Sequence, residues 1–147
     1  MSYINFAQSL KKMKSEGKGL MSEHQYMNIG YIMTALTPCN ILIFGLGEDS
    51  YLWNSLNNGG RTVFIEDNKE WISKFDNSGL EIINITYSTF VGDHEKINFN
   101  SEYLDLKLPD YIEEIEWDMI IVDAPLGHGP PGRPYNGPGR MQSIFKD

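Results

Sequence analysis

The stretch from Cys39 to Glu66, CNILIFGLGEDSYLWNSLNNGGRTVFIE, decides the fold that we expect for this chain. Ile41 to Phe44 are four consecutive apolar residues, the pattern of a strand buried on both faces, and they run directly into Gly45-Leu46-Gly47. Residues typical of a helix start follow, then apolar residues at helical spacing and the stop signal Asn58-Gly59-Gly60. A second apolar run, Thr62 to Ile65, ends in an acidic residue. We therefore predict a strand, a glycine turn, a helix and a second, parallel strand, joined by a right-handed crossover.

This unit indicates a site for a nucleoside-bearing cofactor. Glycines let the backbone approach a ligand closely, and a helix start offers N–H groups and a positive dipole end to a carboxylate or phosphate. Glu66 lies nineteen positions after Gly47 and ends the second strand, where a carboxylate can accept both hydroxyls of a ribose. A Gly-x-Gly pattern with Ser50 in place of a third glycine is a weak signal alone, and a tight turn in any α/β domain would also explain it.

Composition limits the possible partners. The 147 residues fit one domain, and twenty acidic against twelve basic residues give a net charge of −8. This charge argues against nucleic acid as a partner and suits a cationic ligand. The lone cysteine, Cys39, excludes an internal disulfide and is best explained as a small buried residue. Without a long apolar run or a signal-peptide core, we expect no membrane span and a soluble, cytoplasmic chain as written.

The flanking sequence adds helices and two further strands to this unit. We predict a helix over Tyr3–Lys14 and another over Pro109–Ile115. Between them we predict a helix that Ser22 caps and that ends just before Pro38, and a short helix that begins with a capping box at Asp67-x-x-Glu70. We predict a third strand over Leu80–Thr86 and a fourth over Met119–Val122, and between them, over Val91–Lys107, a loop with at most a short strand.

The fourth strand ends at Asp123, which we expect in the same crevice as Gly45 to Ser50 because parallel strands bind ligands at their carboxyl ends. The alternative is that Asp123 only caps the following turn. The Gly- and Pro-rich segment from Leu126 to Gly139 should be a mobile loop over the crevice, where substrate selectivity tends to reside. We predict no metal site, because His94 lies in an acidic turn without a second ligand at a useful helical spacing.

Two cofactors fit these residues. A nicotinamide dinucleotide fold also places an acidic residue at the end of the second strand, but it usually has a third glycine where Ser50 stands. S-adenosylmethionine fits somewhat better. The turn could hold its methionine carboxylate, Glu66 its ribose, and nearby carboxylates suit its sulfonium charge.

Several ordered motifs carry a closer resemblance. FGLGEDSYLWNSLNNGGRTVFIED, EWDMIIVDAPLG and PGRM, with His24-Gln25 and Pro38-Cys39-Asn40 upstream, resemble the polysaccharide-biosynthesis domain family. That family includes plant glucuronoxylan 4-O-methyltransferases and the related irregular-xylem proteins, and the likeness covers roughly Ser22 to Phe145. It implies a class I S-adenosylmethionine-dependent methyltransferase with a doubly wound, mostly parallel, Rossmann-like sheet. The acceptor implied is a sugar hydroxyl, typically of a glucuronic acid side chain on xylan.

The resemblance also implies roles for individual residues. Those expected to hold the cofactor are Gly45, Gly47, Asp49 and Ser50 at the methionine end, Glu66 at the ribose and Asp123 nearest the methyl group. Transfer to a hydroxyl needs a base, and the candidates are Asp123 first and His128 second. Arg140 could pair with a uronate carboxylate, the alternative being an exposed loop arginine. His24 is a further candidate for substrate contact, unless it is exposed or hydrogen-bonded locally.

Two differences from the family affect these expectations. Plant members carry an N-terminal membrane anchor for the Golgi, which we do not expect in this chain as written. A class I methyltransferase sheet also has about three strands beyond the expected order 3-2-1-4, so we expect an incomplete domain over 22–147, after a helical extension over 1–21. A partner chain could complete the sheet. Binding is then a safer prediction than turnover, and a non-catalytic relative that binds the cofactor or a glycan remains an alternative, as does a nicotinamide-dependent enzyme.

Overall fold

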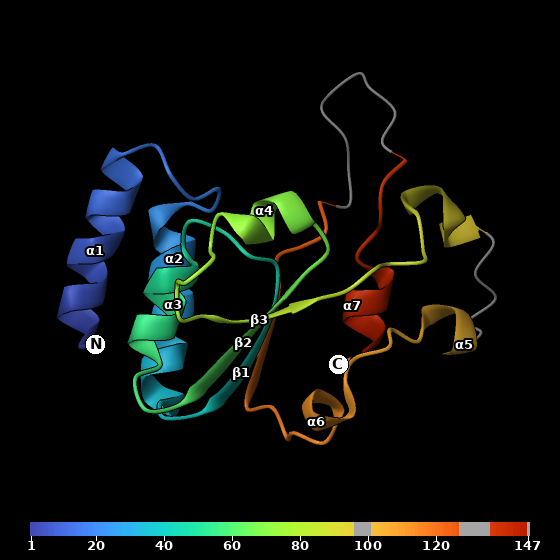
Figure 1. Cartoon of the computed structure of the whole chain (residues 1–147). Coiled ribbons are helices and arrows are strands. Elements are labelled where there is room, and N and C mark those ends of the chain that lie inside the picture. The colour runs from blue at the N-terminus through green and yellow to red at the C-terminus, as the bar shows by residue number, and fades with distance from the viewer. Residues whose placement is uncertain (96–100, 127–135, 147) are drawn as a thin grey trace.

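The computed structural model describes residues 1–95, 101–126 and 136–146 (Figure 1). Helices and strands alternate along most of the chain, as they do in α/β domains. In chain order the described elements are α1 (Tyr3–Ser15), α2 (Glu23–Leu36), β1 (Asn40–Phe44), α3 (Ser50–Leu56), β2 (Arg61–Glu66), α4 (Lys69–Ser73), β3 (Glu81–Asn84), the 3-10 helix η1 (Val91–Glu95), α5 (Ser101–Leu104), α6 (Asp110–Glu113), β4 (Met119–Val122) and α7 (Met141–Phe145).

The described strands form one parallel sheet in the order β3-β2-β1-β4. Leu42 of β1 is in register with Val63 of β2 and Ile120 of β4. This is the strand order that the family resemblance implies. Because β2 and β4 lie on opposite sides of β1, the direction of winding changes between β1 and β4, and open α/β sheets bind ligands at the carboxyl end of such a switch point.

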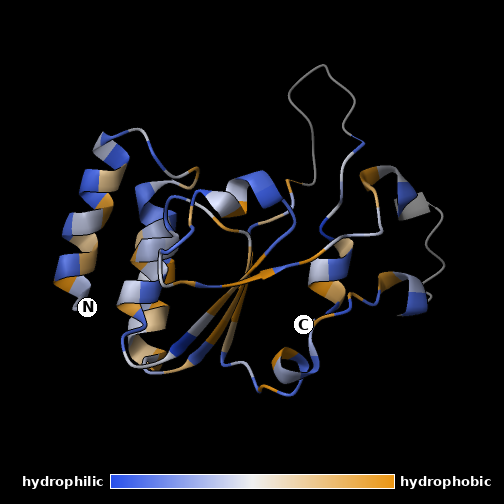
Figure 2. Cartoon of the chain, viewed as in Figure 1, coloured by the Kyte–Doolittle hydropathy of each residue, from blue (hydrophilic) through white to orange (hydrophobic). Residues whose placement is uncertain are grey.

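Helices cover both faces of the sheet, so the domain is doubly wound as predicted. Successive side chains of a strand point to opposite faces. Ile41 and Ile43 of β1 pack in the cluster formed with α1, α2 and α3, whereas Leu42 and Phe44 pack in a second cluster that includes Leu106 and other residues near α6. Figure 2 shows predominantly hydrophobic strands between helices of mixed character.

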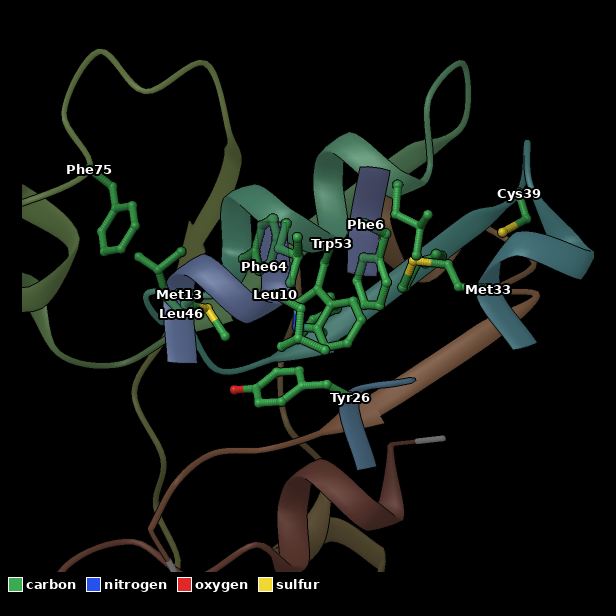
Figure 3. Packing of buried hydrophobic residues seen from close by; sticks show 14 residues of the cluster. Phe6, Leu10, Met13, Tyr26, Met33, Cys39, Leu46, Trp53, Phe64 and Phe75 are labelled. Atoms are coloured by element: carbon green, nitrogen blue, oxygen red, sulfur yellow. The ribbon is translucent and has the colours of Figure 1, made fainter. Parts of the chain in front are cut away.

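The N-terminal helices share one hydrophobic cluster with the central strand. The side chain of Phe6 is fully buried, and a Cβ on Gly30 of α2 would lie 2.4 Å from its ring. The rings of Phe6 and Tyr26 both pack on Trp53 of α3, with centroid separations of 5.6 and 5.5 Å (Figure 3). The division into an extension over 1–21 and a domain over 22–147 stays a prediction, although the packing is continuous across it.

Two local expectations differ from the structure. Asn68, and not Asp67, caps α4, because the Asn68 side chain accepts the N–H of Trp71 at 3.0 Å. The segment from Val91 to Lys107, expected to be loop with at most a short strand, contains η1 and α5. These elements have only five and four residues, too few to give a periodic apolar pattern in the sequence.

Candidate functional site

The turn after β1 needs glycine for steric reasons. Gly45 has a φ of +123°, a conformation that residues with a side chain rarely adopt. A Cβ on Gly45 would lie 3.0 Å from the Cβ of Ala124, and a Cβ on Gly47 would lie 2.7 Å from Oδ1 of Asp49. The two glycines therefore allow the end of β4 and the start of α3 to approach the turn closely.

The N–H groups of the glycine turn are engaged within the protein. The donors and acceptors are Gly45 to the carbonyl of Ile65 at 2.8 Å, Leu46 to Oε2 of Glu66 at 3.0 Å, and Gly47 to Oγ of Ser50 at 2.9 Å. From the sequence we expected N–H groups here to face an anionic part of the ligand. In this structure they fix the turn itself, and Ser50 contributes as an acceptor.

Glu66 connects the glycine turn to the loop after β2. Besides the N–H of Leu46, its carboxylate accepts the N–H groups of Asp67 at 3.0 Å and Asn68 at 2.9 Å. Burial raises the pKa of Glu66, and the hydrogen bonds from Asn68 and Leu46 oppose that rise. Since a carboxylate has about four acceptor positions, roughly one remains. The predicted contact with a ribose is therefore possible for about one hydroxyl rather than for both.

Asp49 and Tyr26 form a buried polar pair beside the turn. Asp49 is 8% exposed and Tyr26 is 1% exposed, and the Tyr26 hydroxyl donates to Oδ2 of Asp49 at 2.8 Å. Burial raises the pKa of Asp49; the Tyr26 hydrogen bond opposes this rise and the charge of Asp123 adds to it. Burial also raises the pKa of Tyr26 well above its ordinary value. Tyr26 is therefore a neutral donor to a carboxylate that burial disfavours.

A cavity of about 420 Å³ opens beside these residues, and we call it the glycine-turn cavity. Its walls are the link between α1 and α2 (17–21), the turn and the start of α3 (45–50), the rings of Tyr26, Trp53 and Trp71, and the end of β4. Its described charged lining residues are Lys18, Glu48, Asp49 and Asp123. Lys18 pairs with Glu16 at 3.0 Å and with Glu48 at 3.7 Å. The cavity is thus acidic on balance, which favours a cationic ligand.

Trp71 forms part of the cavity wall, a position that its sequence context did not indicate. Its indole N–H donates to the carbonyl of Leu46, and Nζ of Lys74 lies 3.8 Å from its ring centroid. The ring is fixed at the cavity edge by these two contacts. The sequence predicts only a short helix here. An indole N–H that is shielded from water usually needs an acceptor, and this need is the one signal in the sequence for such a contact.

Asp123 lines the cavity at the end of β4, as predicted, and its side chain is exposed. Arg140 holds this strand end in place. Among the described residues its guanidinium donates to the carbonyls of Val122 at 3.3 Å, Asp123 at 2.6 Å and Pro125 at 2.8 Å. It is therefore not a free, exposed loop arginine. Three of its five N–H groups are used, so the predicted substrate contact could involve only the other two.

Of the other predicted residues, Glu66, Arg140 and His24 are not among the described residues that line the cavity. His24 is exposed on α2, and its Nε2 lies 3.2 Å from the side-chain nitrogen of Asn28, which corresponds to the local hydrogen-bonding alternative. His128 lies outside the described residues, as does most of the predicted loop from Leu126 to Gly139. The role of His128 as second candidate base stays a prediction.

Three further properties concern the whole described chain. Cys39 is buried at the start of the central strand, as predicted. Within 1–95, 101–126 and 136–146, no three His, Cys, Asp or Glu side chains are grouped so that they could hold a metal ion. The helices in these ranges are all too short or too polar to cross a membrane.

These features define the class of the protein. A parallel, doubly wound sheet carries a glycine turn after its first strand, an acidic residue at the end of its second, and a cavity at the switch point. This is the arrangement of Rossmann-like domains that bind nucleoside-bearing cofactors. The model of the IRX15/IRX15L/GXM family matches residues 25–103, more than half of the chain, and the chain belongs to this family.

Curated relatives from Arabidopsis thaliana extend this result. The chain is 38% identical to glucuronoxylan 4-O-methyltransferase 3 over 134 residues, covering 78% of this chain and 43% of the relative. It is 37% identical to arabinogalactan O-methyltransferase 2 (74% and 43%) and 35% identical to the protein IRREGULAR XYLEM 15 (74% and 38%). The chain thus spans less than half the length of these relatives. No solved structure matches it.

Proposed function

We propose that this chain binds S-adenosylmethionine in the glycine-turn cavity and acts as an O-methyltransferase on a sugar hydroxyl. The specific reaction we propose is 4-O-methylation of glucuronic acid residues in a xylan-type polysaccharide. One observation carries the proposal: an acidic cavity lies at the switch point of a chain similar to proteins named glucuronoxylan 4-O-methyltransferase.

The described residues fit this cofactor. The cavity volume of about 420 Å³ is within the range of roughly 300–1,000 Å³ typical of small-molecule sites. S-adenosylmethionine carries a sulfonium and an ammonium, and Asp49 and Asp123 provide the opposite charge. The ring of Trp71 lines the cavity and offers a flat apolar surface. Glu66 is not a lining residue, but its carboxylate, bonded to the N–H of Leu46 in the turn, keeps about one acceptor position for a ribose hydroxyl. A nicotinamide dinucleotide fits less well, because its pyrophosphate would meet the same carboxylates.

Asp123 is the residue we propose as the base. When bound, S-adenosylmethionine supplies an electrophilic methyl group on a positively charged sulfur. The acceptor hydroxyl must approach this methyl group in line and lose its proton, so a carboxylate within hydrogen-bond reach of the hydroxyl assists. Asp123 can accept that proton because its side chain is exposed in the cavity, while Arg140 fixes its backbone carbonyl. Each turnover then leaves a methyl ether, a neutral sulfide and one proton.

Binding is tested by calorimetric titration of the chain with S-adenosylmethionine, S-adenosylhomocysteine and NAD. We expect the first two to bind and NAD to show no heat of binding. Asp123→Asn should leave binding of S-adenosylhomocysteine nearly unchanged but abolish transfer. The exposed Asp110→Asn, at the start of α6, is the matched control. A folded chain that binds NAD and neither methionine derivative would overturn the proposal.

The acceptor is tested with labelled S-adenosylmethionine and two polysaccharides. Relatives bear the names of both glucuronoxylan and arabinogalactan methyltransferases, so both acceptors belong in the assay. We expect label in glucuronoxylan, with a methyl ether at O-4 of glucuronic acid after hydrolysis. Label in arabinogalactan alone would refute the proposed acceptor but retain the reaction class.

A second candidate is a non-catalytic relative that binds the cofactor or a glycan. The observation that favours it is similarity at 35% and 34% identity to the protein IRREGULAR XYLEM 15 and to IRX15-LIKE, whose names state no reaction. This candidate predicts binding of S-adenosylmethionine or of xylan without label transfer to either polysaccharide.

A further inference from the structure

We propose that Tyr26 is a positioning residue of the cofactor site: it holds the Asp49 carboxylate for the ammonium group at the methionine end of S-adenosylmethionine. This inference rests on the proposed function and names a residue outside the glycine turn. Tyr26 lies in the first turn of α2, twenty-three positions before Asp49 in the chain. The sequence predicts a helix here and indicates no site role for Tyr26.

The first observation is the direction of the Asp49 side chain. Aspartate before a helix commonly accepts an N–H from the first turn of that helix. Within the described residues, Asp49 makes no such capping bond to α3, although it is the residue at the cap position. Its Oδ2 accepts the Tyr26 hydroxyl at 2.8 Å, and the residue lines the glycine-turn cavity. The carboxylate is thus held by side chains at the cavity wall, Tyr26 and Trp53, and not by the backbone N–H groups at the start of α3.

The second observation is that the turn does not offer its N–H groups to this end of the cavity. The N–H groups of Gly45, Leu46 and Gly47 donate to protein acceptors. The methionine end of the ligand carries a carboxylate and an ammonium. Next to the turn, Asp49 can bind the ammonium by a charge-assisted hydrogen bond, which is stronger than one between neutral groups.

The third observation is that Tyr26 itself is immobilised. Its ring stacks on Trp53 with a centroid separation of 5.5 Å, and Figure 3 shows its hydroxyl directed away from the centre of that cluster. On the opposite side, a Cβ on Gly19 would lie 2.5 Å from the Tyr26 hydroxyl. Lys14 fixes the chain there by donating to the carbonyls of Gly19 at 2.8 Å and Met21 at 2.9 Å. Tyr26 can therefore hold Asp49 in one orientation.

The test compares ligands with and without the amino-acid portion. S-adenosylhomocysteine contains the ammonium, whereas 5′-methylthioadenosine lacks the whole aminocarboxypropyl group and retains the nucleoside and sulfur. Tyr26→Phe removes the hydroxyl and keeps the ring. We expect it to weaken S-adenosylhomocysteine about tenfold, the scale of one lost hydrogen bond to a charged group, and to leave methylthioadenosine unchanged within about twofold.

The matched control is Tyr3→Phe. Like Tyr26, Tyr3 donates its hydroxyl, in this case to the carbonyl of Met27 at 3.1 Å, and its ring packs on another aromatic ring, that of Phe6. Unlike Tyr26, it does not line the described cavity. It should leave the binding of both ligands unchanged. Thermal unfolding of each variant checks that the fold is retained.

A double mutant separates positioning from an independent effect. Asp49→Asn keeps an acceptor for the Tyr26 hydroxyl, so it should fold, and it should weaken S-adenosylhomocysteine more than Tyr26→Phe does. If Tyr26 acts through Asp49, adding Tyr26→Phe to Asp49→Asn should cause little further loss. An equal loss for methylthioadenosine, or additive losses in the double mutant, would overturn the inference. Absence of S-adenosylhomocysteine binding to the unmutated chain would instead overturn the proposed function, and this inference with it.

Discussion

The sheet has buried polar side chains both at the edge where its strands begin and at the edge where they end. They are neutral at the first edge and acidic at the second. At the edge where β1 begins, the neutral amide of Asn57 is 1% exposed. Its Oδ1 accepts from Thr37 Oγ1 and from the N–H and Sγ of Cys39, and its Nδ2 donates to the carbonyls of Cys39 and Arg61 and to Thr62 Oγ1. At the edge where β1 ends, the buried groups are carboxylates whose pKa values burial raises.

This difference separates stability from function. A neutral amide whose partners are all in place requires no burial of charge, and Asn57 connects three chain segments by its hydrogen bonds. The protein interior disfavours a buried carboxylate. Its presence is therefore explained more readily by the binding of a ligand than by a contribution to the stability of the fold. The edge at the start of the strands is therefore the stabilising edge, and the edge with Asp49 and Glu66 is the binding edge.

The largest expected effect is at the stabilising edge. Asn57→Ala leaves buried N–H, carbonyl and hydroxyl groups without partners, and we expect a loss of about 3–5 kcal/mol in the free energy of unfolding. Urea denaturation measures it, with the exposed Asn54→Ala of α3 as control. A loss below about 1 kcal/mol would contradict the stabilising role.

Glu66→Gln tests whether a residue of the binding edge also contributes to stability. The glutamine oxygen can accept from Asp67 and Asn68, but its NH₂ group then faces the N–H of Leu46, which loses its acceptor. We expect a loss of about 1–3 kcal/mol in unfolding free energy, together with weaker S-adenosylhomocysteine binding. Glu70→Gln, exposed on α4, is the control. Unchanged stability would mean that the carboxylate hydrogen bonds to the turn contribute nothing.

Two arginine-to-lysine changes compare the edges directly. Arg140 donates to carbonyls at the end of β4, and a lysine ammonium cannot reproduce its planar geometry. Arg61, at the start of β2, pairs with the Glu81 carboxylate at 3.0 and 2.6 Å in a partly exposed position. We expect Arg140→Lys to cost about 1–2 kcal/mol in unfolding free energy and Arg61→Lys at most about 0.5 kcal/mol. Equal costs would mean that Arg140 does not hold the strand end.

The strands and the strand-end carboxylates could be predicted from the sequence, because continuous apolar runs identify buried parallel strands and topology places their ends together. Ile41 to Phe44 and Met119 to Val122 are such runs, and Asp123 lines the cavity as expected. Tyr26 could not be found in this way. Its hydroxyl meets Asp49 only through the packing of α2 on α3, and in the sequence it is one more residue of an apolar stripe.

Asn57 and the glycine turn show the same limit. The sequence marks Asn57 only as a residue near the end of a helix, yet its partners come from segments before β1 and at the start of β2. The glycines signalled a binding turn, but their N–H groups are engaged by Ile65, Glu66 and Ser50. Sequence spacing indicates where backbone groups lie, whereas their hydrogen-bond partners depend on tertiary contacts.

The last expected effect is a small gain in stability, and it tests the binding edge most directly. Burial raises the pKa of Asp49, so the folded state holds its proton more tightly than the unfolded state, where the pKa is about 3.9. Below about pH 3.9 the side chain is protonated in both states and carries no penalty; as pH rises through the folded pKa, the penalty develops fully. Asp49→Asn should therefore stabilise the protein by about 0.5–1 kcal/mol at pH 7 and by almost nothing below about pH 4. Urea denaturation between pH 3 and pH 7, with Asp110→Asn as control, measures the difference. A variant that is less stable than the unmutated chain at pH 7 would show that this carboxylate stabilises the fold, and the contrast between the two edges would then fail at one of the two buried carboxylates of the binding edge.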